Sequence, residues 1–177
     1  MKINLTLAGA LVLGAATAVH AQEVEVTLVD ELDGIKNSYC IDIIGGGPDV
    51  DPANGLQAHT CYSYKGDLGH DQIFDTAKFA KQAFYMTRFD LCAEVDSAEA
   101  GSKLSLSACD GNERQQLLFL YDGSIRPAAA PDLCLTIGTE TFEGGNPIHL
   151  KRDMTMEACD LAAAGARQIW RVRSEDD

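Results

Sequence analysis

Short runs of apolar residues, separated by turn-forming residues, make up most of the chain. From Glu23 to Val29 polar and apolar side chains alternate, which places Val24, Val26 and Leu28 on one face of a predicted strand. Similar short strand patterns occur at residues 83–86, 104–106, 118–121 and 148–150. Many short strands bounded by Gly, Pro, Asn and Asp are typical of an all-β domain.

Three segments add local detail to this pattern. Asp122-Gly123 lies between apolar positions, which predicts a β-hairpin turn. Residues 74–84 contain good helix formers and predict an irregular loop or one helical turn. The segments 155–158 and 161–164 flank Cys159 and are interpreted as a local insertion.

The apolar pattern also repeats three times along the chain. In each copy a cysteine opens an apolar stretch, a second cysteine follows a turn-rich loop, and a glutamine precedes an apolar residue. These positions are Cys40, Cys61 and Gln72-Ile73-Phe74, then Cys92, Cys109 and Gln115-Gln116 before Leu117, Leu118 and Phe119, then Cys134, Cys159 and Gln168-Ile169-Trp170. A period of about fifty residues indicates a supersecondary unit that packs against its own copies. Repeats at about 28–75, 80–125 and 126–172 therefore predict one closed, pseudo-symmetric domain.

The six cysteines allow many pairings, and the repeat selects one of them. Each bridge is expected to close a loop inside its own copy: Cys40–Cys61, Cys92–Cys109 and Cys134–Cys159. A zinc site is the weaker interpretation, because no Cys-x-x-Cys or His-x-x-x-His spacing occurs and His59 is isolated from other ligand types.

The repeated order of Cys-x-Asp, Asn-Gly, Cys and Gln-x-aromatic resembles the ricin B-type β-trefoil lectins. That family has a Cys-Leu-Asp-Val opening and a Gln-x-Trp close in its repeats. The resemblance covers about residues 28–172, although only the third copy keeps the tryptophan, Trp170. It implies a β-trefoil of three repeats with one disulfide in each, and a carbohydrate-binding protein that is not an enzyme.

The resemblance also implies a sugar site in the first repeat. In the family, an aspartate two residues after the first cysteine, a ring two residues before the second, and an Asn-Gln pair hold the sugar. Asp42 matches the aspartate, His59 the ring position and Gln72 the glutamine, and Asp71 replaces the asparagine. A carboxylate accepts hydrogen bonds from two hydroxyls, and a flat ring covers the apolar face of the sugar. For Asp42 the alternative role is a turn carboxylate beside the disulfide.

The other two repeats depart further from the family pattern. The second has Glu94 in place of the aspartate and Ser107 where a ring is expected. The third has Thr136 and Glu157 at those positions. Neither of these repeats is expected to bind a sugar.

The first 21 residues form the pattern of a signal peptide. Lys2 is followed by an apolar run from Leu5 to Val19, and Val19-His20-Ala21 offers small residues at a cleavage point. The run is short for a bilayer span. A single mature domain over residues 22–177 is expected, secreted or periplasmic after cleavage near Ala21.

The formal net charge of −13 restricts the partners. An acidic surface repels nucleic acid and anionic membranes, so a neutral glycan or glycoconjugate is the expected ligand. The alternative is a trefoil without sugar binding that acts as a protein-binding or inhibitory module through its loops.

Catalytic and metal motifs are missing from the sequence. There is no Gly-x-Ser-x-Gly and no His-Glu-x-x-His, and the expected disulfides leave no thiol nucleophile. Asp49, Asp51 and Asn54 offer oxygen ligands but lack the calcium-loop pattern and its closing Glu. The sequence therefore predicts no enzyme activity, no metal and no cofactor.

Overall fold

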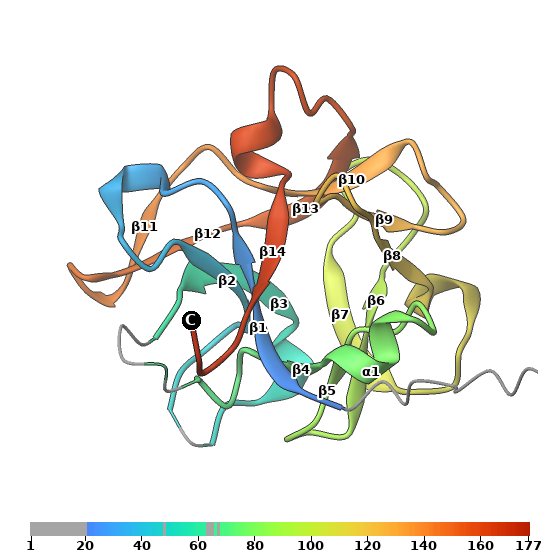
Figure 1. Cartoon of the computed structure of the whole chain (residues 1–177), viewed down its shortest axis with the longest axis horizontal. Coiled ribbons are helices and arrows are strands. Elements are labelled where there is room, and N and C mark those ends of the chain that lie inside the picture. The colour runs from blue at the N-terminus through green and yellow to red at the C-terminus, as the bar shows by residue number, and fades with distance from the viewer. Residues whose placement is uncertain (1–20, 48, 63–65, 67) are drawn as a thin grey trace, which may run out of the picture.

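The computed structural model describes residues 21–177 except 48, 63–65 and 67. The chain forms a β-trefoil, and Figure 1 shows the first repeat in blue and teal, the second in green and yellow, and the third in orange and red around the centre. The predicted signal peptide lies almost entirely outside the described residues.

Each repeat contributes four strands to the trefoil. In the first repeat they are β1 (Glu23–Leu28), β2 (Tyr39–Ile43), β3 (Leu56–Thr60) and β4 (Ile73–Asp75). The second has β5 (Tyr85–Met86), β6 (Leu91–Val95), β7 (Leu104–Ala108) and β8 (Leu117–Phe119). The third has β9 (Ile125–Pro127), β10 (Leu133–Ile137), β13 (Met154–Ala158) and β14 (Trp170–Arg173).

Helices are short and lie in the connections. They are η1 (Leu32–Gly34), η2 (Pro52–Asn54), α1 (Thr76–Phe79), η3 (Glu113–Gln115) and η4 (Gly165–Arg167). The single turn of α1 confirms the helical turn expected within residues 74–84 and is capped by the Asp75 side chain. No helix in the described part of the chain is long and apolar enough to cross a membrane.

The three repeats share the same strand order and the same pairing register in their central hairpins. β2 pairs with β3, β6 with β7 and β10 with β13, always antiparallel. The residue two places after the first cysteine lies opposite an equivalent partner in each hairpin: Asp42 faces Gln57, Glu94 faces Ser105 and Thr136 faces Thr155. The disulfides Cys40–Cys61, Cys92–Cys109 and Cys134–Cys159 are all present, as expected.

The apolar residue that closes each repeat lies in the common core. Phe74, Leu117 and Trp170 are almost completely buried. Each follows a buried glutamine by two positions, which settles the second repeat as Gln115-Gln116-Leu117. Burial of these apolar faces is the main force that holds the three copies together.

The predicted Asp122-Gly123 turn joins β8 to β9 and has Gly123 at a positive φ of 81°.

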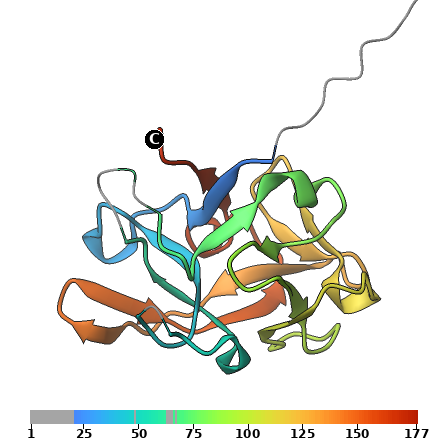
Figure 2. The ribbon, with the colours of Figure 1, turned by 90° about the horizontal axis from the view of Figure 1, so that it is seen from below.

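The insertion in the third repeat differs from the expected one. Residues 154–158 form the trefoil strand β13, and the extra element is the hairpin of β11 (Phe142–Asn146) and β12 (His149–Arg152). This β11–β12 hairpin reaches the first repeat, where β12 pairs with the free edge of β3. Figure 2 shows it in orange beside the teal strands of the first repeat. The sequence pattern suggested only a short strand near residue 149 because a polar edge hairpin has little apolar alternation.

A buried arginine fixes the β11–β12 hairpin to the first repeat. The Arg152 guanidinium donates to both oxygens of the Asp33 carboxylate: Nη2 lies 2.9 Å from Oδ1 and 2.8 Å from Oδ2, and Nε lies 3.1 Å from Oδ2. Its Nη1 donates to the carbonyl of Gly138 at 2.8 Å. Tyr39 donates to the same carboxylate. The hairpin is therefore an integral part of the domain and not a loose loop.

Candidate functional site

The four residues predicted to hold a sugar do lie together in the first repeat. Asp42 is on β2, His59 is on β3, and Asp71-Gln72 immediately precedes β4. Gln57 and Gln72 each donate a side-chain amide hydrogen bond to the Asp42 carboxylate, at 2.9 and 2.8 Å. The carboxylate is therefore held at the centre of the group.

This group is buried. Asp42 and Gln72 are 0% exposed, His59 is 3% exposed and Asp71 is 6% exposed. The cover over His59 is the β11–β12 hairpin: Lys151 lies opposite His59 in the strand register, and a Cβ added to Gly144 would lie 2.7 Å from His59 Nε2. Direct contact between a ligand and Asp42, His59 or Gln72 is blocked in this conformation.

The imidazole of His59 is also enclosed by other rings. Its centroid lies 5.3 Å from that of Tyr62 and 5.5 Å from that of His149. Nδ1 lies 2.9 Å from the carbonyl of Thr60, which fits an Nδ1–H that donates to that oxygen. His59 thus supports the neighbouring rings, and its own faces are not open to solvent.

An open cleft lies beside the buried group. It has a volume of about 320 Å³ and is lined by Gly47, Tyr62, Gly69, His70 and Asp71. Asp71 is the predicted site residue that reaches it. Tyr62 forms a wall: its hydroxyl lies 3.4 Å from Asp71 Oδ2, and a Cβ at Gly69 would meet the ring at 2.2 Å. Sequence reasoning missed Tyr62, although an aromatic residue directly after Cys61 was a usable signal.

Burial controls the protonation of this region. It raises the pKa of Asp42 to about 8, against the hydrogen bond from Gln57, and the nearby charge of Asp71 raises it further. Burial likewise raises the pKa of Asp71 above its ordinary value. The same desolvation lowers the pKa of His59, so the imidazole is neutral at pH 7.

Gln72 differs from the equivalent glutamines of the other repeats. Gln115 Oε1 accepts backbone hydrogen bonds from Asp110 and Gly111, and Gln168 Oε1 accepts one from Asp160. Gln72 Oε1 is buried without a hydrogen-bond partner among the described residues. Among the described residues, the first repeat therefore shows no backbone support for this glutamine like that in the other two repeats.

The second repeat uses its carboxylate internally. Glu94 accepts a hydrogen bond from Ser107 at 2.9 Å and forms an ion pair with Arg114 at 3.2 Å. Gln115 donates to the same serine. These contacts agree with the expectation that the second repeat does not bind a sugar. That expectation stays a prediction.

The third repeat contains an open groove of about 410 Å³. Thr136, Glu157, Arg167 and Gln168 are among the residues that line it. Gln168 donates to Thr136 at 2.9 Å, and Arg167 donates to the carbonyl of Ile137 at 3.0 Å. The lining lacks an aromatic ring, so the groove offers hydrogen bonds without a stacking surface.

One further group of possible ligand atoms lies near the core. Within the described residues, Glu25, Cys40 and Cys61 bring three potential metal-ligating side chains together. Both sulfurs belong to the first disulfide, and Glu25 is paired with Arg173. This group therefore offers no thiolates and no free carboxylate to a metal.

Comparisons with known proteins agree with this architecture. Residues 82–177 match the ricin-type beta-trefoil lectin domain. No curated protein sequence matches the chain. Among solved structures, an agglutinin from Abrus precatorius is similar with a TM-score of 0.63 at 15% identity over 89% of this chain, which spans 50% of the agglutinin chain. The chain likewise spans 48% of a non-toxic homologue of type II RIPs from Momordica charantia, with a TM-score of 0.59 at 15% identity over 87% of this chain.

Two smaller proteins match over nearly their whole length. The C-terminal domain of an earthworm lectin, a mutant solved with 6'-sialyllactose, has a TM-score of 0.55 at 16% identity, covering 86% of this chain and 98% of that one. ThreeFoil, a designed three-fold symmetric protein, has a TM-score of 0.55 at 15% identity, covering 85% and 96%. Fold and repeats together define a lectin-type β-trefoil. The chain belongs to the ricin-type beta-trefoil lectin domain family, whose general activity is carbohydrate binding.

Proposed function

We propose that the protein binds a neutral sugar in the first-repeat cleft and acts by binding, without catalysis. The observation that carries this proposal is the arrangement of the Tyr62 ring beside the Asp71 carboxylate in an open cleft. An aromatic face and a carboxylate are the two groups that sugar recognition needs.

Each group has a definite role in the proposal. Asp71 accepts hydrogen bonds from two neighbouring hydroxyls, and Tyr62 covers the apolar face of the ring. Asp42, His59 and Gln72 are buried and serve as positioning residues. The His59 ring lies beside that of Tyr62, and Gln72, next to Asp71 in the chain, is hydrogen-bonded to Asp42. This assignment keeps the predicted site residues and changes which of them meet the ligand.

The proposal predicts that binding weakens in acid. Asp71 accepts two hydroxyl hydrogen bonds only when it is ionised, and its pKa is raised above 3.8 by burial. As the pH falls through this raised pKa, the carboxylate gains a proton and one acceptor site is lost. Sugar binding should therefore decline as the pH is lowered through this raised pKa.

A glycan array followed by titration calorimetry tests the site. Asp71→Asn and Tyr62→Ala should each weaken a neutral-sugar hit at least about tenfold, since each removes a principal contact. Glu157→Gln, a carboxylate-to-amide change in the third-repeat groove, is the matched control and should leave binding unchanged. Loss of binding in Glu157→Gln alone would assign the sugar to the third repeat instead.

Export is part of the proposal and rests on the signal-peptide pattern of residues 1–21. We propose a secreted or periplasmic mature protein. N-terminal sequencing of protein recovered outside the cytoplasm should begin at Gln22. Recovery of the full chain with Met1 would contradict it.

A protein-binding role is the second candidate, and an exposed apolar surface favours it. Leu120, Tyr121 and Val172 are 37%, 113% and 41% exposed, and they border a groove of about 470 Å³ with Phe119 and Trp170. Exposed apolar patches often mark interaction sites. An array without any sugar hit would favour this role over the first.

A further inference from the structure

A further pocket lies where the three repeats meet, and we propose that it binds an acidic sugar, a hexuronic acid residue. This inter-repeat pocket has a volume of about 160 Å³ and is lined by Ile44, Leu56, Gln57, Lys103, Phe142, Lys151, Arg152, Asp153 and Met154. The proposal rests on the carbohydrate-binding function proposed above, and it concerns a different site and a different class of sugar.

The pocket exists because of the β11–β12 hairpin. In the strand register Phe142 lies opposite Lys151, and Lys151 lies opposite His59, so the hairpin extends the sheet of the first repeat sideways. Lys103 comes from the second repeat, where Gly55 approaches the carbonyl of Leu104 so closely that an added Cβ would lie 3.2 Å from it. All three repeats thus supply side chains.

The charge of the pocket is opposite to that of the molecule. Lys103 is exposed and Lys151 is half-buried, and neither forms an ion pair with an acidic side chain in the described part of the chain. The charge of Arg152 is already balanced by Asp33. Asp153 is the one carboxylate in the lining. Two unpaired ammonium groups around one small pocket, in a chain of net charge −13, favour an anionic ligand.

The remaining contacts favour a sugar over a simple anion. Phe142 is 45% exposed and offers a ring face at one side of the pocket, and Ile44 adds apolar surface. Gln57 is 7% exposed, and its Nε2 is used by Asp42, while no described hydrogen bond engages its Oε1. A hexuronic acid matches these groups: its carboxylate meets the lysines, a hydroxyl donates to Gln57, and its C–H face covers the phenyl ring.

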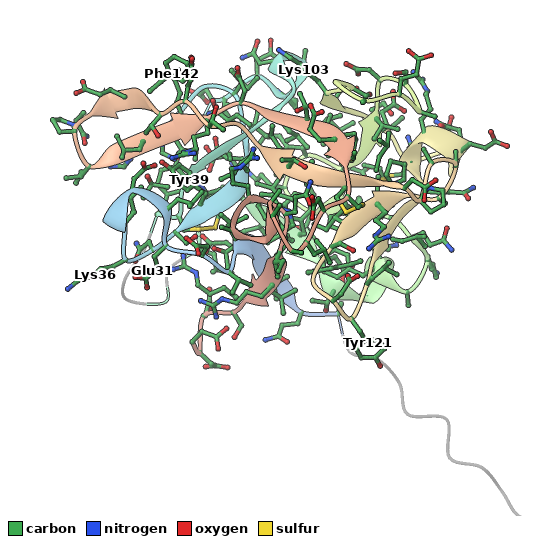
Figure 3. All side chains as sticks on the ribbon, turned by 90° about the horizontal axis from the view of Figure 1, so that it is seen from above. Glu31, Lys36, Tyr39, Lys103, Tyr121 and Phe142 are labelled. Carbon is green, nitrogen blue, oxygen red and sulfur yellow. A yellow bond between two sulfur atoms is a disulfide. The ribbon has the colours of Figure 1, made fainter. Side chains whose placement is uncertain are left out.

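The pocket is separate from the cleft proposed for neutral sugars. Its lining shares no residue with that of the first-repeat cleft. Figure 3 shows Phe142 and Lys103 along one edge of the molecule, away from Lys36 and Tyr121. The size of the pocket suits one sugar residue and not a longer stretch of glycan.

NMR titration of the full mature protein with D-glucuronate and D-galacturonate tests the proposal, with D-glucose, D-galactose and acetate as comparison ligands. At least one uronate should shift the resonances of Gln57 and Lys151, and added salt should weaken the effect. Lys151→Gln and Lys103→Gln should each raise the dissociation constant about tenfold, whereas Asp153→Asn should lower it. Lys36→Gln, an exposed lysine elsewhere, should change nothing.

The outcomes separate this proposal from the first one. Uronate binding that survives the Lys103→Gln/Lys151→Gln double variant, or equal shifts with acetate, would overturn the acidic-sugar pocket. If neutral sugars bind and are sensitive to Asp71→Asn while no uronate binds, the first-repeat proposal stands and this one falls. Uronate binding that is lost in Lys151→Gln but kept in Asp71→Asn supports this pocket whether or not a neutral sugar binds.

Discussion

Asp42 has the position of the family's sugar-binding aspartate but lies in a buried environment. Its place two residues after Cys40 predicts a sugar ligand, whereas the structure encloses it between the amides of Gln57 and Gln72. The residue pattern was sufficient to predict which side chains meet. It could not predict the burial of His59, because the cover over His59 comes from a hairpin about ninety residues further along the chain, beyond the reach of local periodicity.

The buried carboxyl of Asp42 should make the protein less stable in mild base. Burial raises its pKa to about 8, while in the unfolded chain it is already ionised at neutral pH. Between these two pKa values the folded state holds a proton that the unfolded state has released. Stability therefore falls as the pH rises through this interval.

Urea unfolding at pH 7 and pH 9 measures this effect. We expect a loss on the order of 1 kcal/mol over that range, because the folded state gives up the Asp42 proton within it. Asp42→Asn should remove most of the difference, since the amide does not titrate. An equal slope in wild type and Asp42→Asn would assign the pH dependence to another group.

At the level of elements, the trefoil strands were predictable and the inserted hairpin was not. Each of β2, β6 and β10 is a short apolar run next to a cysteine, and each begins one residue before that cysteine. In the β11–β12 hairpin, β11 is mostly exposed and β12 is mostly half-buried. The hairpin is held by polar contacts such as those of Arg152, which leave no periodic signal in the sequence.

Arg152 should therefore stabilise the fold through the geometry of its guanidinium group as well as through its charge. Arg152→Lys keeps the charge and loses the forked geometry that reaches both Asp33 and the carbonyl of Gly138. We expect a loss of about 1–3 kcal/mol in the free energy of unfolding, because the buried Arg152 side chain makes charge-assisted hydrogen bonds that a lysine can only partly replace.

The exposed pair of Arg114 and Glu94 provides the matched control. Arg114 is 55% exposed, so Arg114→Lys should change the free energy of unfolding by no more than about 0.5 kcal/mol. Chemical denaturation of both variants under the same conditions gives the comparison. Equal small effects would mean that the β11–β12 hairpin is held by its strand pairing with β3 and not by Arg152.

At the scale of the whole molecule, pseudo-symmetry is the property that the sequence predicted best. Three disulfides of similar span and three equivalent hairpins follow from one repeated unit. The side chains at the equivalent positions of the three repeats are less symmetric than the fold. The first repeat has an open cleft beside a covered carboxylate, the second uses its carboxylate internally, and the third has a polar groove. A shared backbone therefore does not give the three repeats a shared binding site.

Trp170, the only tryptophan of the chain, should contribute strongly to stability because it closes the core. It is 2% exposed, and its indole Nε1 donates to the carbonyl of Leu135 in β10 at 3.0 Å. Trp170→Ala should cost roughly 3–5 kcal/mol, because it leaves a cavity where the repeats meet. Trp170→Phe keeps most of the apolar area and loses the hydrogen bond, so it should cost about 1–2 kcal/mol.

Circular dichroism is the appropriate measurement, since both variants lose the intrinsic tryptophan signal. Val172 lies two residues further along the same strand and is 41% exposed, so Val172→Ala is the control and should cost less than about 1 kcal/mol. The free energy of unfolding should fall most in Trp170→Ala, less in Trp170→Phe and least in Val172→Ala. This order follows from the buried volume and the hydrogen bond that each substitution removes. If Trp170→Ala were no more costly than Val172→Ala, the third repeat would not close the core through Trp170.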